Sequence, residues 1–248
     1  MRRKRPVRPL RLTSGLMFLI ILVVIPQIGW TTEGGTIVGS VYFRGTPPPP
    51  VQMPIDKDND VCGTGFRELI EVNVGPDETL RDIVVCVRSG ETGLVFETPE
   101  GGFKLNQKDC QFVPDIMIIP AGEKLRITNR DPIIHNIHTF EIIKGRRRDL
   151  FNFAQPERGH RRTEKIKPRR SNTVELTCEV HSFMHGWIYV SDGSACVVSK
   201  DGHFRMTQVP DGTHTVTVWH PTLGEQEVEV IMEGAEELTV DFEFDAAD

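Results

Sequence analysis

Long amphipathic helical patterns are absent from this sequence, and so is an apolar run long enough to cross a bilayer. Its N-terminal apolar run, residues 16–25, is shorter than the roughly 20 residues that a transmembrane helix needs. The run follows eleven residues that carry six basic and no acidic side chains, and Pro26 ends it. This arrangement predicts an export signal over residues 1–30. A clean small-x-small cleavage site is also lacking, so both cleavage and retention as an N-terminal anchor are compatible with the sequence.

Aromatic residues are scarce in the most basic part of the chain, which argues against nucleic-acid binding by base stacking. Residues 144–170 contain eleven Lys or Arg and three acidic residues, a balance of +8. Without residues 1–30, which carry six positive charges, the formal charge of −6 becomes −12 for the exported part. Such asymmetry predicts either a solvated loop or electrostatic steering of a partner, which would be an acidic redox protein docking near residues 144–170.

Short β-rich runs fill most of the remaining sequence. Residues 36–43 alternate between apolar and polar side chains, and further runs include 83–87, 124–128 and 213–219. Asp-Gly pairs at 192–193, 201–202 and 211–212 have the spacing of tight hairpins. The pattern predicts an all-β fold, and a sandwich is favoured over a closed barrel.

The cysteine count is odd. In an oxidising compartment an unpaired cysteine is either a free thiol or occupied by another group. If Cys178 binds a metal ion, Cys62, Cys86, Cys110 and Cys196 remain as an even set, which allows three disulfide pairings. Cys86, inside an apolar run, is also compatible with a buried free thiol.

Three soft or borderline metal ligands lie within seven residues: Cys178, His181 and Met184. Two histidines, one cysteine and a weak axial methionine form the blue-copper electron-transfer site. His135 supplies the missing histidine, because it follows a polar break after a predicted strand and so reaches the end of a sheet. Taken alone this histidine would be an ordinary surface or core residue. The second cluster is what makes it a candidate ligand.

Residues 129–140 and 178–187 together resemble the cupredoxins, most closely the amicyanin-like type in which two residues separate each ligand of the second cluster. The resemblance covers residues 103–192 and implies a Greek-key β-sandwich with one type 1 copper ion. It implies that His135, Cys178, His181 and Met184 are the copper ligands and that Asn136 ties the two ligand loops together. With these ligands, an exposed edge of His181 or His135 near Phe183 is expected to pass the electron. The tyrosine corner of many cupredoxins is absent from residues 172–176.

A second resemblance covers the flanks. Residues 199–220 resemble the carboxypeptidase regulatory-like, transthyretin-type β-sandwich, and residues 35–45 and 80–87 resemble its first strands. This implies a second small Ig/transthyretin-like sandwich made of residues 34–102 and 193–248, with the copper domain inserted between them. The alternative is a series of sequential domains. The combination also resembles exported proteins described as methylamine-utilisation-like.

These observations predict an exported, periplasmic electron-transfer protein that is not an enzyme. Copper storage, sensing or delivery would use the same residues, and a β-sandwich scaffold is a third alternative. The sequence argues against an oxidase or nitrite-reductase role, because Thr177 and Glu179 flank Cys178 in place of the His-Cys-His run that couples a blue site to a second copper centre. Met184 argues against zinc, and no orienting partner or oxyanion device supports a Cys-His hydrolase.

Overall fold

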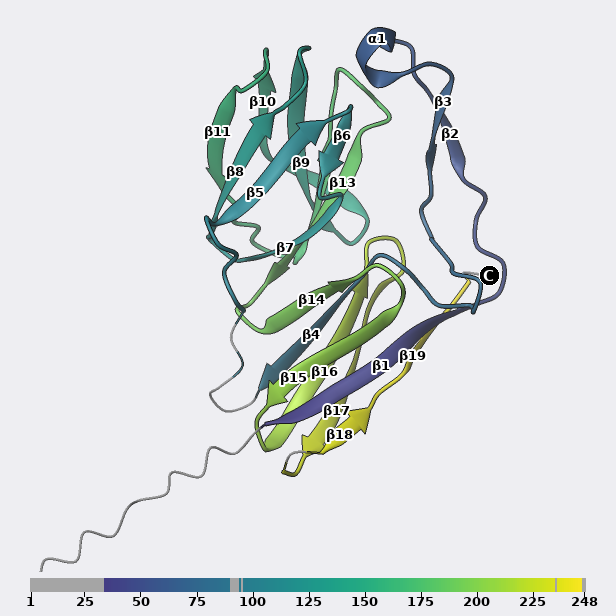
Figure 1. Ribbon diagram of the computed structural model, residues 1–248, viewed down its shortest axis with the longest axis vertical. Coiled ribbons are helices and arrows are strands. Elements are labelled where there is room, and N and C mark those ends of the chain that lie inside the picture. Colours follow the sequence, from purple (N-terminus) through teal and green to yellow (C-terminus); the bar gives the residue numbers. More distant parts are fainter. Residues whose placement is uncertain (1–33, 90–93, 95, 235, 247–248) are drawn as a thin grey trace, which may run out of the picture. The chain divides into compact units, whose positions relative to one another are not determined.

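The computed structural model describes residues 34–89, 94, 96–234 and 236–246 (Figure 1). Apart from the short helix α1 (Asn59–Cys62), the regular elements of this part of the chain are β-strands, so the predicted all-β fold is confirmed. The predicted export signal or anchor, residues 1–30, lies outside the described residues. Among the residues that are described, no helix has the length and apolar character of a membrane span.

Strands from the two ends of the chain pair with each other in two sheets. In one, β1 (Gly35–Arg44) lies between β15 (His203–Val209) and β18 (Glu237–Thr239), and β19 (Phe242–Asp245) continues beside it. The other sheet has the order β14 (Ala195–Ser199), β4 (Ile83–Ser89), β16 (Gly212–His220), β17 (Gly224–Met232). Alternate side chains of both sheets, such as Ile37 and Val216, share one apolar core. We call this unit, residues 35–50, 70–89 and 195–245, the split sandwich.

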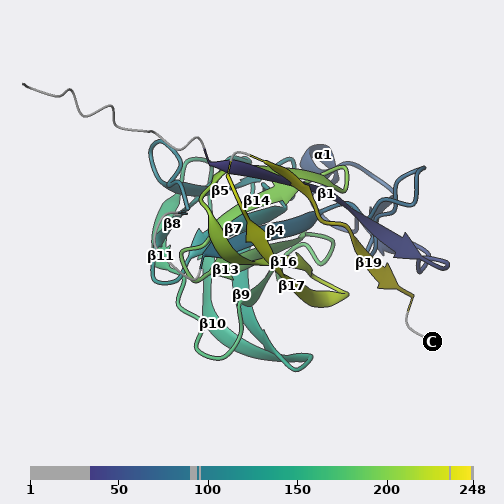
Figure 2. The same cartoon turned by 90° about the horizontal axis from the view of Figure 1, so that it is seen from below.

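All strands of two further sheets come from residues 103–191, which we call the central sandwich. One sheet has the order β10 (Arg146–Gln155), β9 (His135–Ile143), β12 (Thr173–Thr177), β13 (His185–Ser191), β7 (Ile116–Pro120). The other has the order β11 (Arg161–Lys165), β8 (Lys124–Asn129), β5 (Phe103–Lys108), β6 (Gln111–Val113). Figure 2 shows β9 and β10 running side by side as a long hairpin. Leu105, Ile127 and Leu176 are among the fully buried side chains of the core between the two sheets.

A separate hairpin precedes the central sandwich in sequence. It consists of β2 (Val51–Pro54) and β3 (Phe66–Leu69), and α1 lies in the loop between them (Figure 1). Met53, Ile55 and Val61 of this segment pack against the core of the central sandwich. Residues 51–69 therefore add to the central sandwich a covering that none of its own strands provides.

The disulfides are Cys62–Cys110 and Cys86–Cys196, one of the three pairings that the sequence allows. The first joins α1 to the turn between β5 and β6. The second joins paired positions of β4 and β14, so Cys86 is not a free thiol. Cys178 is free and buried. Each of the three Asp-Gly pairs lies where one strand ends and the next begins, and their glycines have positive φ angles. The predicted tight hairpins are wrong, because the flanking strands β13 and β14, β14 and β15, and β15 and β16 belong to different sheets and do not pair.

Candidate metal centre

The ends of three neighbouring strands bring the predicted ligands together. His135 begins β9, Cys178 directly follows β12, and Met184 directly precedes β13, with His181 in the loop between the last two strands. Because β12 pairs with both β9 and β13, these three strand ends lie next to one another at the same end of the sheet. Ligands on loops and strand ends next to a rigid sheet are held firmly in place.

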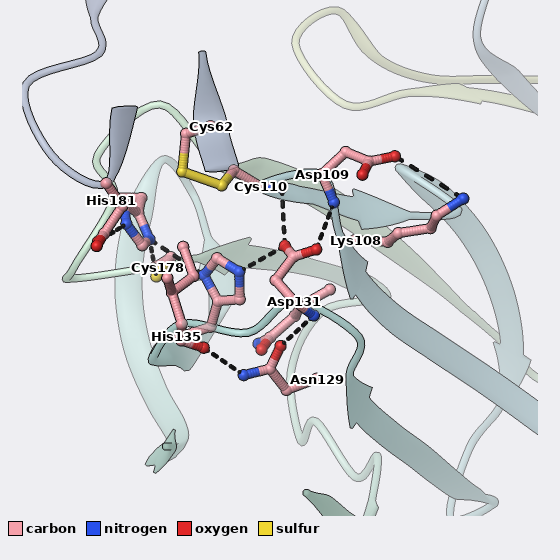
Figure 3. A network of polar contacts seen from close by, with 12 residues as sticks. Cys62, Lys108, Asp109, Cys110, Asn129, Asp131, His135, Cys178 and His181 are labelled. Carbon is pink, nitrogen blue, oxygen red and sulfur yellow. Dashed lines mark hydrogen bonds and ion pairs between the residues drawn. A yellow bond between two sulfur atoms is a disulfide. The ribbon is translucent and has the colours of Figure 1, made fainter. Parts of the chain in front are cut away.

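At this end of the sheet, the imidazoles of His135 and His181 and the sulfur of Cys178 face each other. The Nδ1 atoms of His135 and His181 are 3.1 Å apart, and Nδ1 of His181 is 3.9 Å from Sγ of Cys178 (Figure 3). His135, Cys178 and His181 are buried, and their ligand atoms lie within 4.8 Å of one another. Met184 is buried in the same apolar cluster as Cys178, and its amide donates to the carbonyl of His181 at 3.0 Å.

Each imidazole is fixed from its far side by a carboxylate. Nε2–H of His135 donates to Asp131 at 2.8 Å, and Nε2–H of His181 donates to Asp58 at 2.9 Å. In the neutral rings, with the proton on Nε2, both Nδ1 atoms present lone pairs toward each other and toward Cys178. Two lone pairs at 3.1 Å repel each other unless a proton or a metal ion lies between them. Carboxylates that hold the outer nitrogen of ligand histidines are a common feature of metal sites.

Asp131 is itself held by backbone amides. Its carboxylate accepts hydrogen bonds from the amides of Asp109 and Cys110, both at 2.9 Å (Figure 3). Burial raises the pKa of Asp131, but these amides and His135 outweigh it, so the pKa lies below its ordinary value. Asn129 completes the support, because its Oδ1 accepts from the amide of Asp131 at 2.8 Å. His135 is thus oriented by an ionised carboxylate before any metal ion binds.

The sulfur of Cys178 lies among hydrogen-bond donors. The amide of Asn136 donates to Sγ at 3.3 Å. Burial raises the pKa of the Cys178 thiol, but hydrogen bonds from backbone amides and from His135 and His181, which donate when a proton is present on Nδ1, lower it more, to about 6. The thiolate, which is the form that binds metal ions, therefore predominates at neutral pH.

The Asn136 side chain connects the two ligand segments. Its Oδ1 accepts from the amide of Glu179 at 3.2 Å, and its Nδ2 donates to Oδ1 of Asn152 at 2.5 Å. Strand β9, the neighbouring strand β10 and the loop after Cys178 are thereby joined by one side chain.

Two other nearby histidines, His138 and His185, have different contacts. The His138 ring nitrogens contact Glu179 at 2.7 Å and Asp149 at 2.6 Å. Nε2–H of His185 donates to the carbonyl of Ser182 at 2.9 Å. Both rings are therefore engaged with groups other than the three buried ligands.

The expected exposed imidazole edge is wrong. His135 and His181 have no exposed surface, because Asp131 covers one ring and the loop that carries Asp58 covers the other. Sequence reasoning missed both carboxylates. Asp131 lies four residues before His135, inside the motif that identified that histidine, and this spacing is a usable signal. Asp58 lies 123 residues from His181, and no local pattern connects them.

No family model matches the chain, and no curated protein matches its sequence. Among solved structures, a reduced amicyanin mutant is 16% identical, with a TM-score of 0.31 over 43% of this chain and 99% of that chain. Amicyanin from Paracoccus versutus is 16% identical, with a TM-score of 0.31 over 42% and 97%. A purple cupredoxin from Nitrosopumilus maritimus is 24% identical, with a TM-score of 0.28 over 38% and 88%. Scores of this size carry no weight for this chain, whose function is inferred from the side chains of the site.

Proposed function

We propose that the chain is an exported type 1 copper protein that acts in electron transfer and is not an enzyme. His135, Cys178 and His181 would hold one copper ion, with Met184 as the weak axial ligand and Asn136 supporting the ligand loops. The observation that carries the proposal is the convergence of two carboxylate-fixed imidazoles on the buried free sulfur of Cys178. A copper ion held there would alternate between Cu(I) and Cu(II) and so would carry one electron.

The donor set and its surroundings favour a redox role. Thiolate, thioether and imidazole together suit copper better than other common metal ions. The amide of Asn136 and the carboxylates of Asp58 and Asp131 hold the ligands in place, so little rearrangement is needed when charge changes. The burial of both imidazoles favours electron transfer over catalysis, because a substrate would need direct access to the site.

The compartment follows from the cysteines. Two disulfides are typical of proteins that function outside the cytoplasm. We propose the periplasm or a comparable extracytoplasmic space, reached through residues 1–30 as a signal or as a retained anchor.

An acidic redox partner docking near residues 144–170 belongs to the same proposal. The strand register divides this stretch into two parts. Gln155 pairs with His135 and Arg161 pairs with Thr128, whereas Arg146 pairs with Ile143 at the opposite end of β9. At about 3.4 Å per residue the length of β9 is roughly 27 Å. Residues 155–162 therefore suit electron exchange better than the basic turn at 144–148.

Copper storage or delivery is the second candidate. The observation that favours it is the position of Asp58 on a loop, with 35% of its side chain exposed, because such a loop could open to admit or release an ion. A scaffold role is the third alternative, and it would leave the thiolate and both imidazoles without a purpose.

The test uses residues 31–248 loaded with Cu(II). We expect an intense visible absorption from thiolate-to-copper charge transfer, the narrow copper hyperfine splitting of type 1 sites in electron-spin resonance, and fast reversible reduction. Cys178→Ser should abolish the colour, whereas His138→Gln, at a nearby rim position, should keep it. A colourless copper-bound protein would contradict electron transfer, and release of copper on contact with an acceptor instead of redox cycling would favour delivery.

A further inference from the structure

The partner of His181 comes from outside the central sandwich. Asp58 lies in the loop between β2 and β3, directly before α1, and its carboxylate is 2.9 Å from Nε2 of His181. This contact covers the imidazole edge that would otherwise face solvent, so that His181 is fully buried while the Asp58 side chain keeps 35% of its surface exposed.

The backbone holds Asp58 in an uncommon conformation. Its φ angle is 50° and its ψ angle 40°, in the left-handed region that Asp and Asn tolerate better than most residues. Its carbonyl accepts hydrogen bonds from the amides of Val61 and Cys62, both at 2.9 Å. The first turn after Asp58 therefore fixes its backbone and directs its side chain toward His181.

A disulfide joins this loop to the support of the other imidazole. Cys62 is bonded to Cys110, and the amide of Cys110 donates to the Asp131 carboxylate that holds His135 (Figure 3). The Asp58 carbonyl thus connects to the Asp131 carboxylate through the amide of Cys62, the disulfide and the amide of Cys110.

Arg67 closes the other side of the loop. Its guanidinium donates to the carbonyl of Cys110 at 2.5 Å and lies 5.1 Å from the centroid of the Phe183 ring. Phe183 follows His181 in the loop before β13, and the two rings pack at 5.6 Å between centroids. Residues 55–67, which we call the cap, therefore contact the His181 loop through Asp58 and through Arg67.

We propose that the cap is part of the metal centre, with Asp58 as the positioning residue of His181. Asp58 keeps the proton of His181 on Nε2, directs Nδ1 toward Cys178 and excludes water from the thiolate. The Cys62–Cys110 disulfide keeps the cap in place. This inference rests on the proposed copper function and extends it to a segment outside the ligand-bearing sandwich.

The first test needs no metal ion. Asp58→Gly removes the carboxylate without straining the left-handed backbone, and Asp58→Asn keeps a hydrogen-bond acceptor but loses the charge. Asp60→Asn is the matched control, because Asp60 is an exposed acid in the first turn of α1, two residues after Asp58. Long-range ¹H–¹⁵N spectra report the tautomer of His181, and iodoacetamide reports the access of solvent to Cys178, the free cysteine.

We expect the Nε2–H tautomer of His181 in the wild type, in Asp58→Asn and in Asp60→Asn, and a mixture of tautomers in Asp58→Gly. Alkylation of Cys178 should accelerate roughly 10-fold or more in Asp58→Gly, the effect of losing one charge-assisted hydrogen bond. An unchanged tautomer and an unchanged alkylation rate in Asp58→Gly would overturn the proposal.

The second test uses copper-loaded protein. Asp58→Gly should lower copper affinity about 10- to 100-fold, the usual effect of removing a residue that supports a ligand. The reduction potential should rise in Asp58→Gly and Asp58→Asn, since both remove a negative charge beside the site, and should stay near the wild-type value in Asp60→Asn. Equal potentials in all four proteins would contradict a role of Asp58 at the centre.

The disulfide provides an independent variant. Cys62→Ala with Cys110→Ala leaves Asp58 in place but removes its covalent attachment, so Cys178 alkylation should accelerate as it does in Asp58→Gly. A double variant that is folded by circular dichroism and alkylates at the wild-type rate would show that the disulfide does not hold the cap. If the wild type failed to bind copper, the proposed function would fall, while the metal-free measurements would still decide the role of Asp58.

Discussion

Burial and hydrogen bonds from backbone amides determine the protonation state of individual side chains in this fold. His220 is an example outside the metal centre. It is 1% exposed, and its Nδ1 accepts hydrogen bonds from the amides of Thr222 and Leu223, both at 3.2 Å. Burial lowers the His220 pKa to about 4, although Asp82 acts in the opposite direction. The native protein therefore requires this imidazole to be neutral.

Stability should fall as the pH falls through the range set by His220. Between about 6.5, the ordinary pKa, and about 4, the unfolded chain binds a proton at this position that the native protein does not. The contribution approaches about 3 kcal/mol once the pH is below both values. Urea unfolding between pH 7 and pH 4 should show a smaller pH dependence in His220→Asn, which keeps an acceptor but does not titrate. Parallel curves for the two proteins would contradict this assignment.

Glu141 is the second side chain of this kind. It is fully buried, pairs with Arg148, and accepts hydrogen bonds from the amides of Arg169, Arg170 and Ser171 at 2.5 to 2.8 Å. Its removal would leave three amides and a guanidinium without their acceptor. We expect Glu141→Ala to lower the free energy of unfolding by about 3 kcal/mol. The exposed Glu229→Ala is the control, and equal unfolding midpoints for the two variants would refute the role of Glu141.

For single residues, the sequence predicted those candidate ligands that lie close to one another along the chain. Cys178, His181 and Met184 follow one another at a spacing that few structural roles share, and His135 was found because a polar break precedes it. Asp58 could not be found this way. Its contact with His181 depends on a hairpin, a left-handed residue and a disulfide that act together, and none of these has a signal near the ligands.

The two disulfides join different elements of the chain: Cys62–Cys110 attaches the cap to the central sandwich, and Cys86–Cys196 joins two strands of the split sandwich. Cys86–Cys196 joins positions that already face each other in the β4–β14 pair, and it closes a loop with a sequence separation of 110. Replacing both cysteines by Ala should lower the free energy of unfolding by about 4 to 5 kcal/mol, because the unfolded chain gains freedom. Chemical denaturation measures this loss. The copper-dependent absorption should stay unchanged, since the ligands lie in the central sandwich, and its loss would show that the two sandwiches are coupled.

Strand periodicity predicted most elements, because alternating burial imposes a period of two residues on the sequence. The pattern was weaker for the hairpin β2–β3. None of the residues of β2 and β3 is buried, and Phe66 is 65% exposed. The hairpin that carries the cap therefore lacks the buried apolar positions by which core strands are recognised in a sequence.

The whole molecule combines strands from both ends of the chain with a middle part whose strands pair only among themselves in the described sheets. A chain that ends at residue 192 should keep the sheets of the central sandwich but lose the partners of β1 and β4. We expect limited proteolysis of this variant to degrade residues 34–50 and 80–89 quickly and to spare residues 103–191. Mass spectrometry of the surviving fragments tests this, and equal protection of both regions would show that the split sandwich does not need its C-terminal strands.

The Cys86–Cys196 bond also has a mechanical consequence. Tension applied to the two ends of the chain would run along the backbone to Cys86, cross the disulfide and leave through Cys196. Residues 87–195, with His135, Cys178 and His181 among them, would carry none of it. The strands that resist first would be β1 and β19, which pair in parallel and so must break their hydrogen bonds together in shear. With this disulfide intact, tension on the ends would thus bypass the three ligands but would pass through the cap, because residues 55–67 lie between β1 and Cys86. Reduction of the Cys86–Cys196 bond would place the ligands on the path of the force as well.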